Sequence, residues 1–183
     1  MGWSLYVVSK KLLCDIVFSS DNDLLGKIES CVVCGAIYGK GTAIESMTKI
    51  SEEVLDLIEK HKPHIFLVEN YQYIPGKTNG GAAIPSLITL LRYHWYKCTD
   101  TDAHLPYTQT WKSAILRSQC AVKMEIREYV KAIFPRLYKD MESAFNAVGH
   151  QGEQDSIDAV AIGLYGTLLA AQILRESKDV VFE

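Results

Sequence analysis

The sequence predicts an α/β protein in which helices flank a mixed central β-sheet, and three observations lead to that prediction. Three short β-rich segments open the chain, at residues 4–9, 12–19 and 31–38. Helical and strand-like patterns then alternate toward the C-terminus, in the order β-β-β-α-β-α-β-α-α. With 183 residues and 48% apolar side chains, the chain suits a single globular domain over residues 1–183.

The first half of the chain supplies most of the predicted strands. Lys, Asp, Asn and Gly separate the three opening segments, which is typical of an antiparallel meander. Residues 43–61 carry apolar side chains at three- and four-residue steps and predict an amphipathic helix that ends before Pro63. Residues 64–70 include four consecutive apolar positions, as in a strand covered on both faces, and Glu69 lies at the end of this segment.

The second half is predicted to be mainly helical. An apolar stripe predicts a helix from about residue 84 to 98, and residues 103–109 predict a short strand. Another helix is expected over residues 123–134, where Pro135 would stop it. The last helix, from about residue 155 to 176, is rich in Ala and Leu and has one buried side.

The composition restricts the setting of the protein. Its apolar and charged fractions fit neither a disordered nor a fibrous chain. No run approaches the roughly 18 to 20 apolar residues that span a bilayer, so we expect no membrane partner. The N-terminus lacks the pattern of a signal peptide, and we expect an intracellular protein, in the cytoplasm or nucleoid of a bacterium, in an organelle or in a virus-infected cell.

The net charge of -3 is an average over segments of opposite sign. Residues 77–136 contain nine Lys or Arg against four Asp or Glu, a net charge of +5, whereas the segments before and after carry -3 and -5. A mildly acidic protein would ordinarily bind nucleic acid poorly, but a basic central segment reverses that expectation. The sequence therefore predicts a DNA-binding surface in this segment.

Three basic residues in this segment share one helix face. Lys123, Arg127 and Lys131 recur every four residues, a spacing that could follow a phosphate backbone. The alternative is a solvated face balanced by Glu125 and Glu128. The Thr-Trp-Lys stretch that precedes this helix favours contact with DNA.

Three carboxylates lie at positions where α/β folds usually place ligand-binding or catalytic residues. Glu69 follows a predicted buried strand, and ligand sites of α/β sheets gather at such strand ends. Asp155 and Asp158 lie three positions apart at the start of the last helix, so both point to one side. Helix capping explains such acids equally well, but the apolar residues that follow place them at the rim of a core. A cluster of three would offer Mg²⁺ or Mn²⁺ the hard oxygens that two-metal phosphodiester hydrolysis requires.

Taken in order, these motifs resemble the RuvC-type Holliday junction resolvases of the RNase H-like superfamily. The matching segments are residues 68–72 (Val-Glu-Asn-Tyr-Gln), 110–112 (Thr-Trp-Lys), Lys123 at a helix start, and 154–163, which contain Asp-x-x-Asp-Ala-x-Ala-Ile. The resemblance covers residues 2 to about 169 and implies an RNase H-like fold. The carboxylate motif is its most specific part.

The resemblance implies a Mg²⁺-dependent crossover junction endodeoxyribonuclease, which cuts four-way and other branched DNA junctions. Two Mg²⁺ or Mn²⁺ ions per active site would be held by the catalytic carboxylates Glu69, Asp155 and Asp158. Water would then attack the phosphodiester between the two ions.

The resemblance also implies how DNA is held. Lys112 and Lys123 would contact the phosphate backbone near the scissile bond, and Tyr71 and Tyr73 would stack on unpaired bases at the junction centre. Because a four-way junction needs two matched cuts, the family implies a homodimer. A residual exposed strip on the helix predicted over residues 84–98 could supply its interface.

The family's first catalytic Asp has no counterpart at the expected place. In the family it precedes a Gly-aromatic pair by about ten residues, and that pair opens this chain. Three explanations stay open: the chain begins downstream of the true start and lacks the usual first strand, a Ser replaces the acid on an altered first strand at residues 4–9, or Asp15, Asp21 or Asp23 serves instead. Asp15 has apolar neighbours on both sides and would otherwise be an outward-facing strand residue.

Two other functions are compatible with these motifs. A resolvase-like protein without its first acid would bind junctions, or serve as a subunit, without cutting. Another nuclease of the same superfamily would act on flaps or RNA–DNA hybrids. His150, in a glycine-containing loop before the last helix, is either a plain loop residue or an aid to proton transfer.

Overall fold

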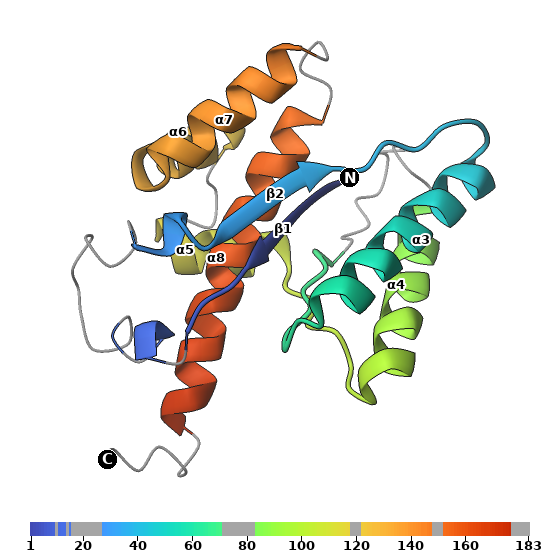
Figure 1. The fold of residues 1–183 in the computed structure, drawn as a ribbon, viewed down its shortest axis with the longest axis horizontal. Helices are drawn as coiled ribbons and strands as arrows, with labels where there is room; N and C mark the ends of the chain where they lie inside the picture. Colours follow the sequence, from blue (N-terminus) through green and yellow to red (C-terminus); the bar gives the residue numbers. More distant parts are fainter. Residues whose placement is uncertain are drawn as a thin grey trace. The chain divides into compact units, whose positions relative to one another are not determined.

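The protein is mainly helical (Figure 1). This computed structural model describes residues 1–9, 11–13, 15, 27–70, 83–117, 122–147 and 152–176. Of the described residues, 69% are helical and 8% are in strands, and these strands form one two-stranded sheet. The predicted mixed central β-sheet of an RNase H-like fold is therefore wrong. Short apolar runs caused the error, because periodicity alone does not tell a buried strand from other buried segments.

The longest helices fall where the sequence predicted them, with ends that differ by no more than two residues. The elements in chain order are β1 (Gly2–Tyr6), β2 (Val32–Ala36), α3 (Ala43–His61), α4 (Ala83–Thr99), α5 (Thr108–Leu116), α6 (Lys123–Ile133), α7 (Pro135–Asn146) and α8 (Glu153–Glu176).

Three predicted strands are absent from the described residues. The described part of the segment 12–19 is helical, and the segments 64–70 and 103–109 share a single parallel bridge between Leu67 and His104. Three backbone hydrogen bonds join the last two segments, from His104 N to Phe66 O, from Val68 N to His104 O and from Asn70 N to Pro106 O, but this pairing is too short to form a strand of a sheet.

Helix α7 was not predicted, because Pro135 was expected only to end the helix before it. Pro135 instead occupies the first turn of α7. A proline costs nothing there, since its missing N–H would have no partner within the helix. Tyr138, Met141 and Phe145 on α7 are buried in the core.

The chain divides into two compact units. We call the first the hairpin unit, which comprises Met1–Ala36 and Trp111–Glu183, and the second the α3–α4 unit, which comprises Ile37–Thr110.

The hairpin unit is organised by β1 lying along α8 (Figure 1). The strands pair antiparallel, from Gly2 opposite Ala36 to Tyr6 opposite Val32. The predicted three-strand meander is therefore wrong, because in a meander the first and third strands run parallel and the second lies between them. A Cβ atom at Gly163 of α8 would overlap the Tyr6 ring and lie 2.6 Å from the Ser4 hydroxyl oxygen. Only glycine therefore lets strand and helix approach this closely.

Hydroxyl groups of β1 fix its register on the helix. Ser4 Oγ donates to the carbonyl oxygen of Ala159 at 2.7 Å, and Tyr6 Oη donates to that of Val160 at 2.5 Å. Burial raises the pKa of Tyr6 well above its usual value, so the hydroxyl stays protonated and remains a donor. These two hydrogen bonds therefore hold β1 at one position along α8.

Helix α8 is also the centre of the hydrophobic core. Its Ile157, Val160 and Leu164 are at most 2% exposed. By length and composition alone, α8 could cross a membrane. The expectation that no apolar run is long enough to span a bilayer is therefore wrong for this helix. A core helix passes the same test, and the lack of a membrane partner stays a prediction.

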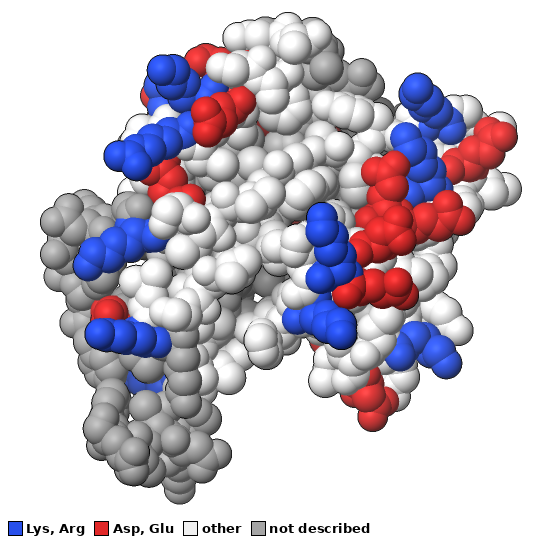
Figure 2. Space-filling model, viewed as in Figure 1, with Lys and Arg blue, Asp and Glu red and all other residues white. Residues whose placement is uncertain are grey.

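In the α3–α4 unit, α3 begins at a capping box. Thr42 Oγ1 accepts from the N–H of Glu45 at 3.3 Å, and Glu45 Oε2 accepts from the N–H of Thr42 at 2.7 Å. The buried side of α3 packs against α4. Its solvent side carries the exposed acids Glu52, Asp56 and Glu59, and Figure 2 shows acidic side chains gathered on this helix.

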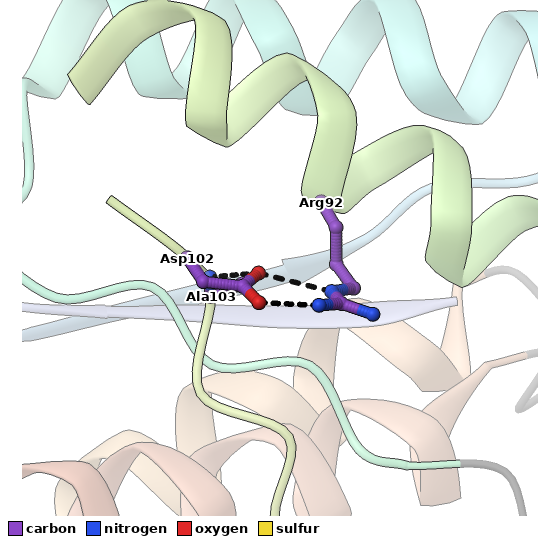
Figure 3. A network of polar contacts seen from close by, with 3 residues as sticks. All are labelled: Arg92, Asp102 and Ala103. Atoms are coloured by element: carbon purple, nitrogen blue, oxygen red, sulfur yellow. Dashed lines mark hydrogen bonds and ion pairs between the residues drawn. The ribbon is translucent and has the colours of Figure 1, made fainter. Parts of the chain in front are cut away.

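An Arg–Asp pair ties α4 to the chain that follows it (Figure 3). Arg92 Nε donates to Asp102 Oδ1 at 3.0 Å and its Nη2 donates to Oδ2, while Oδ1 also accepts from the N–H of Ala103 at 2.8 Å. Hydrogen bonding from Arg92 is the main cause that holds the pKa of Asp102 below its ordinary value.

We predict that Gly163→Ala destabilises the protein by about 2 kcal/mol, because overpacking against β1 outweighs a helix-propensity gain of about 1 kcal/mol. Urea unfolding would measure this change. Gln172→Ala, on the exposed side of α8, is the control and should have little effect. A Gly163→Ala protein as stable as the wild type would show that β1 does not approach α8 so closely.

We predict that the Asp102 carboxyl titrates below the ordinary range for Asp and that Arg92→Gln raises its pKa. Because the folded-state pKa is lowered, the pair stabilises the fold above the unfolded pKa, and this contribution is lost as the pH falls through the folded pKa. Carboxyl-detected NMR titration is the measurement, with Lys97→Gln as the control. An Asp102 titration that is the same in both variants contradicts the pairing.

Candidate functional site

Glu69 belongs to the α3–α4 unit and is held by backbone pairing around it. Val68 N donates to His104 O at 3.0 Å and Asn70 N donates to Pro106 O at 2.9 Å, so the Glu69 backbone is fixed on both sides. Its half-buried carboxylate accepts a hydrogen bond from Thr108 Oγ1 at 2.7 Å. Although the predicted strand is reduced to a bridge, the carboxylate still has a defined place.

Asp155 and Asp158 lie in the first turns of α8, in the hairpin unit. The Asp155 side chain is 60% exposed, and its Oδ2 lies 3.7 Å from the terminal ammonium of Met1. Asp158 is half-buried and accepts from Gln154 Nε2 at 2.9 Å. The pair therefore stands at the edge of the core, as the sequence predicted, and both carboxylates are accessible to solvent.

An ion pair connects this turn of α8 to α6. Arg127 Nη1 donates to Glu153 Oε1 at 3.1 Å, and the exposed fractions of the two side chains are 32% and 9%. Glu153 precedes Asp155 by two residues. The contact therefore fixes α6 against the first turn of α8 within one unit.

The three cations predicted to share a face of α6 differ in their surroundings. Lys123 is the first residue of the helix and is exposed. Lys131 is exposed, and its Nζ lies 5.6 Å from the centroid of the Tyr138 ring. Arg127 is engaged with Glu153. Two of the three are therefore open to a phosphate, and the third serves first as a structural partner.

Lys112 lies on α5 next to the buried Trp111. Its Nζ is 5.6 Å from the centroid of the Trp111 ring, and the side chain is half-buried. Trp111 is 1% exposed, so the Trp of the Thr-Trp-Lys stretch is a core residue that anchors α5. The neighbouring lysine is held near the protein surface.

Several other candidates lie apart from this site or outside the described residues. Asp15 is exposed in a short helical stretch. Five other candidates lie outside the described residues: Tyr71, Tyr73, Asp21, Asp23 and His150.

Among the described residues, no single cluster of side chains contains enough ligands to hold a metal ion by itself. No group of three or more His, Cys, Asp or Glu side chains that could hold a metal occurs among the described residues. Asp155 and Asp158 provide two carboxylates on one side of α8, which is the ligand type that Mg²⁺ and Mn²⁺ prefer. The pair fits a divalent cation as part of a ligand set, and Glu69 lies in the other unit.

Sequence reasoning missed the role of Glu153. An acid just before an apolar helix indicates capping, and nothing local shows that this carboxylate pairs with a side chain 26 positions away. The burial of Glu153 could not be read from its polar neighbours either.

Comparisons with protein families, curated proteins and solved structures each find no match. The resemblance to resolvases therefore depends on the order and spacing of the motifs in this chain.

We predict that Arg127→Met lowers the free energy of unfolding by about 3 kcal/mol, because it removes the cation that faces the buried Glu153. Chemical denaturation is the measurement, and Arg136→Met on the exposed side of α7 is the control. The double variant with Glu153→Leu should recover most of the loss, since apolar residues often replace buried pairs well. A loss as small as that of the control would show that Arg127 is a solvated surface residue.

Proposed function

We propose that this protein is a metal-dependent endonuclease that cuts branched DNA such as four-way junctions. The observation that carries the proposal is the Arg127–Glu153 ion pair, which joins a basic helix to the turn that bears Asp155 and Asp158. A phosphodiesterase needs carboxylates for a cation and basic groups for the phosphate backbone, close to each other. The hairpin unit supplies both.

In the proposed reaction, Asp155 and Asp158 bind Mg²⁺ or Mn²⁺. Such an ion supplies an activated water and neutralises charge on the scissile phosphate. The hydrogen bond from Gln154 orients the Asp158 carboxylate, and the exposed Asp155 can turn toward a ligand. These residues hold the cation at the rim of the core, where a phosphate can approach it.

The α6 cations orient the substrate in this proposal. Lys123 and Lys131 contact phosphates of the bound DNA, and Lys112 on α5 adds a further contact. Each such contact releases counterions and strengthens binding at low salt.

The branched substrate, the role of Glu69 and the paired cuts of a homodimer come from the resemblance to RuvC-type resolvases. The proposal does not depend on the fold predicted from that resemblance, which the structure contradicts. It depends on the arrangement within the hairpin unit and on the order of the motifs.

We predict that the protein cleaves a synthetic four-way junction in Mg²⁺ and that Asp155→Asn and Asp158→Asn each lower the rate by at least about 100-fold, because each removes a carboxylate that the cation needs. Gel-based cleavage of a labelled junction measures the rate. Asp140→Asn, an exposed acid on α7, is the control and should cleave normally.

Three results would contradict this function. They are the absence of cleavage by the wild type in both Mg²⁺ and Mn²⁺, cleavage that survives both substitutions, and equal cleavage of linear duplex. Tight junction binding without cleavage would identify the protein as a junction-binding protein instead.

A further inference from the structure

Ser156 lies between Asp155 and Asp158 at the start of α8 and is fully buried. Its exposed fraction is 0%, although the neighbouring Asp155 side chain is 60% exposed. Serine is mostly a surface residue, and a buried hydroxyl needs a hydrogen-bond partner. The proposed reaction does not use this hydroxyl, so its burial beside the carboxylate pair calls for another role.

The partner of Ser156 lies on the two-stranded sheet. Ser156 Oγ donates to the carbonyl oxygen of Gly35 on β2 at 3.0 Å, across 121 positions of the chain. Gly35 is itself held in place, because it pairs with Trp3 of β1 and the Trp3 ring covers it. A Cβ atom at Gly35 would lie 2.9 Å from a carbon of that ring. The hydrogen bond therefore ties the start of α8 to a fixed point on the sheet.

A second contact holds the same turn of the helix. Gly2 of β1 packs against the peptide group that joins Asp155 to Ser156, where there is no room for a Cβ atom. The Ser156 N–H also donates to Gly152 O at 3.0 Å. Both strands thus hold this peptide group, β1 by close packing and β2 through the serine hydroxyl.

Helix geometry couples this tether to the directions of the carboxylates. At 3.6 residues per turn, Asp155 and Asp158 lie roughly 60° apart around the helix axis. Ser156 lies roughly 100° from the first and roughly 160° from the second. Because the serine hydroxyl fixes the rotation of the turn against β2, it also fixes the direction in which both carboxylates leave the helix. Helix ends otherwise fray, and fraying would scatter the two ligands.

We propose that Ser156 is a positioning residue that orients the α8 carboxylate pair for a divalent cation through its hydrogen bond to Gly35. This inference rests on the proposed function and deepens it, because it identifies what sets the direction of the two metal ligands. Mg²⁺ demands near-ideal octahedral geometry, whereas Ca²⁺ accepts variable ligand directions. Removing the hydroxyl therefore weakens Mg²⁺ binding more than Ca²⁺ binding, a difference that a purely stabilising hydroxyl would not produce.

The test measures the binding of Mg²⁺ and of Ca²⁺ to the full chain by isothermal titration calorimetry. We expect Ser156→Ala to bind Mg²⁺ about tenfold more weakly, because the ion must then restore an orientation that one hydrogen bond maintained. The Ca²⁺ affinity should change by less than about twofold. Ser156→Cys fills the site but donates only weakly, so it should show an intermediate loss of Mg²⁺ affinity, and it serves as the test if Ser156→Ala does not fold.

Thr167→Val is the matched control. Thr167 is 5% exposed on α8, and its Oγ1 donates to Gly163 O at 3.1 Å within the helix. This substitution also removes one buried hydroxyl of α8, but it leaves the first turn tied to β2. We expect both variants to unfold at lower urea concentrations and only Ser156→Ala to change the preference between Mg²⁺ and Ca²⁺.

Unchanged Mg²⁺ affinity in Ser156→Ala, or equal losses for the two ions, would overturn the positioning role. If the wild type then still cuts junctions and its Mg²⁺ binding is lost in Asp155→Asn, only the positioning role fails. If the wild type binds neither ion, or binds both equally well after Asp155→Asn, the proposed function fails together with the positioning role.

Discussion

The contact between β1 and α8 is the constraint on which the hairpin unit depends. Glycine at position 163 lets the strand lie against the helix, and Ser4 and Tyr6 then reach the helix carbonyl groups. A second close approach brings Gly2 against the backbone of Asp155. Because that approach occurs at the first turn of α8, the packing of the strand also sets where the carboxylate pair stands.

The polar pairs of this unit extend that constraint to α6. Arg127 reaches Glu153 from α6, and the buried Ile126 fixes which side of α6 faces solvent. The core residues of α8 thus position its carboxylates, and the core residues of α6 position its cations. A buried ion pair is weak evidence for stability, but here it fixes where α6 meets the first turn of α8.

The sequence was a good guide to helices and a poor guide to sheet. The periodic patterns of α3 and α8 are local, so their ends could be predicted to within two residues. Whether an apolar run such as residues 64–70 becomes a strand depends on distant partners, and here its pairing with residues 104–106 is limited to a short stretch around the Leu67–His104 bridge. Gly163 gave a usable signal, because a glycine within a helical pattern often marks a close approach. No local feature of the sequence indicated the pairing of Arg127 with Glu153.

We propose that the start of α8 binds a divalent cation. Adding Mn²⁺ to the labelled protein and recording the broadening of amide NMR signals tests this claim directly, because the ion broadens the signals of nearby nuclei. We expect the strongest broadening at Glu153, Asp155 and Asp158, with weaker effects on the first turn of α6. The acidic side of α3 is an internal comparison. Broadening centred on α3, or spread evenly over exposed acids, would contradict the claim.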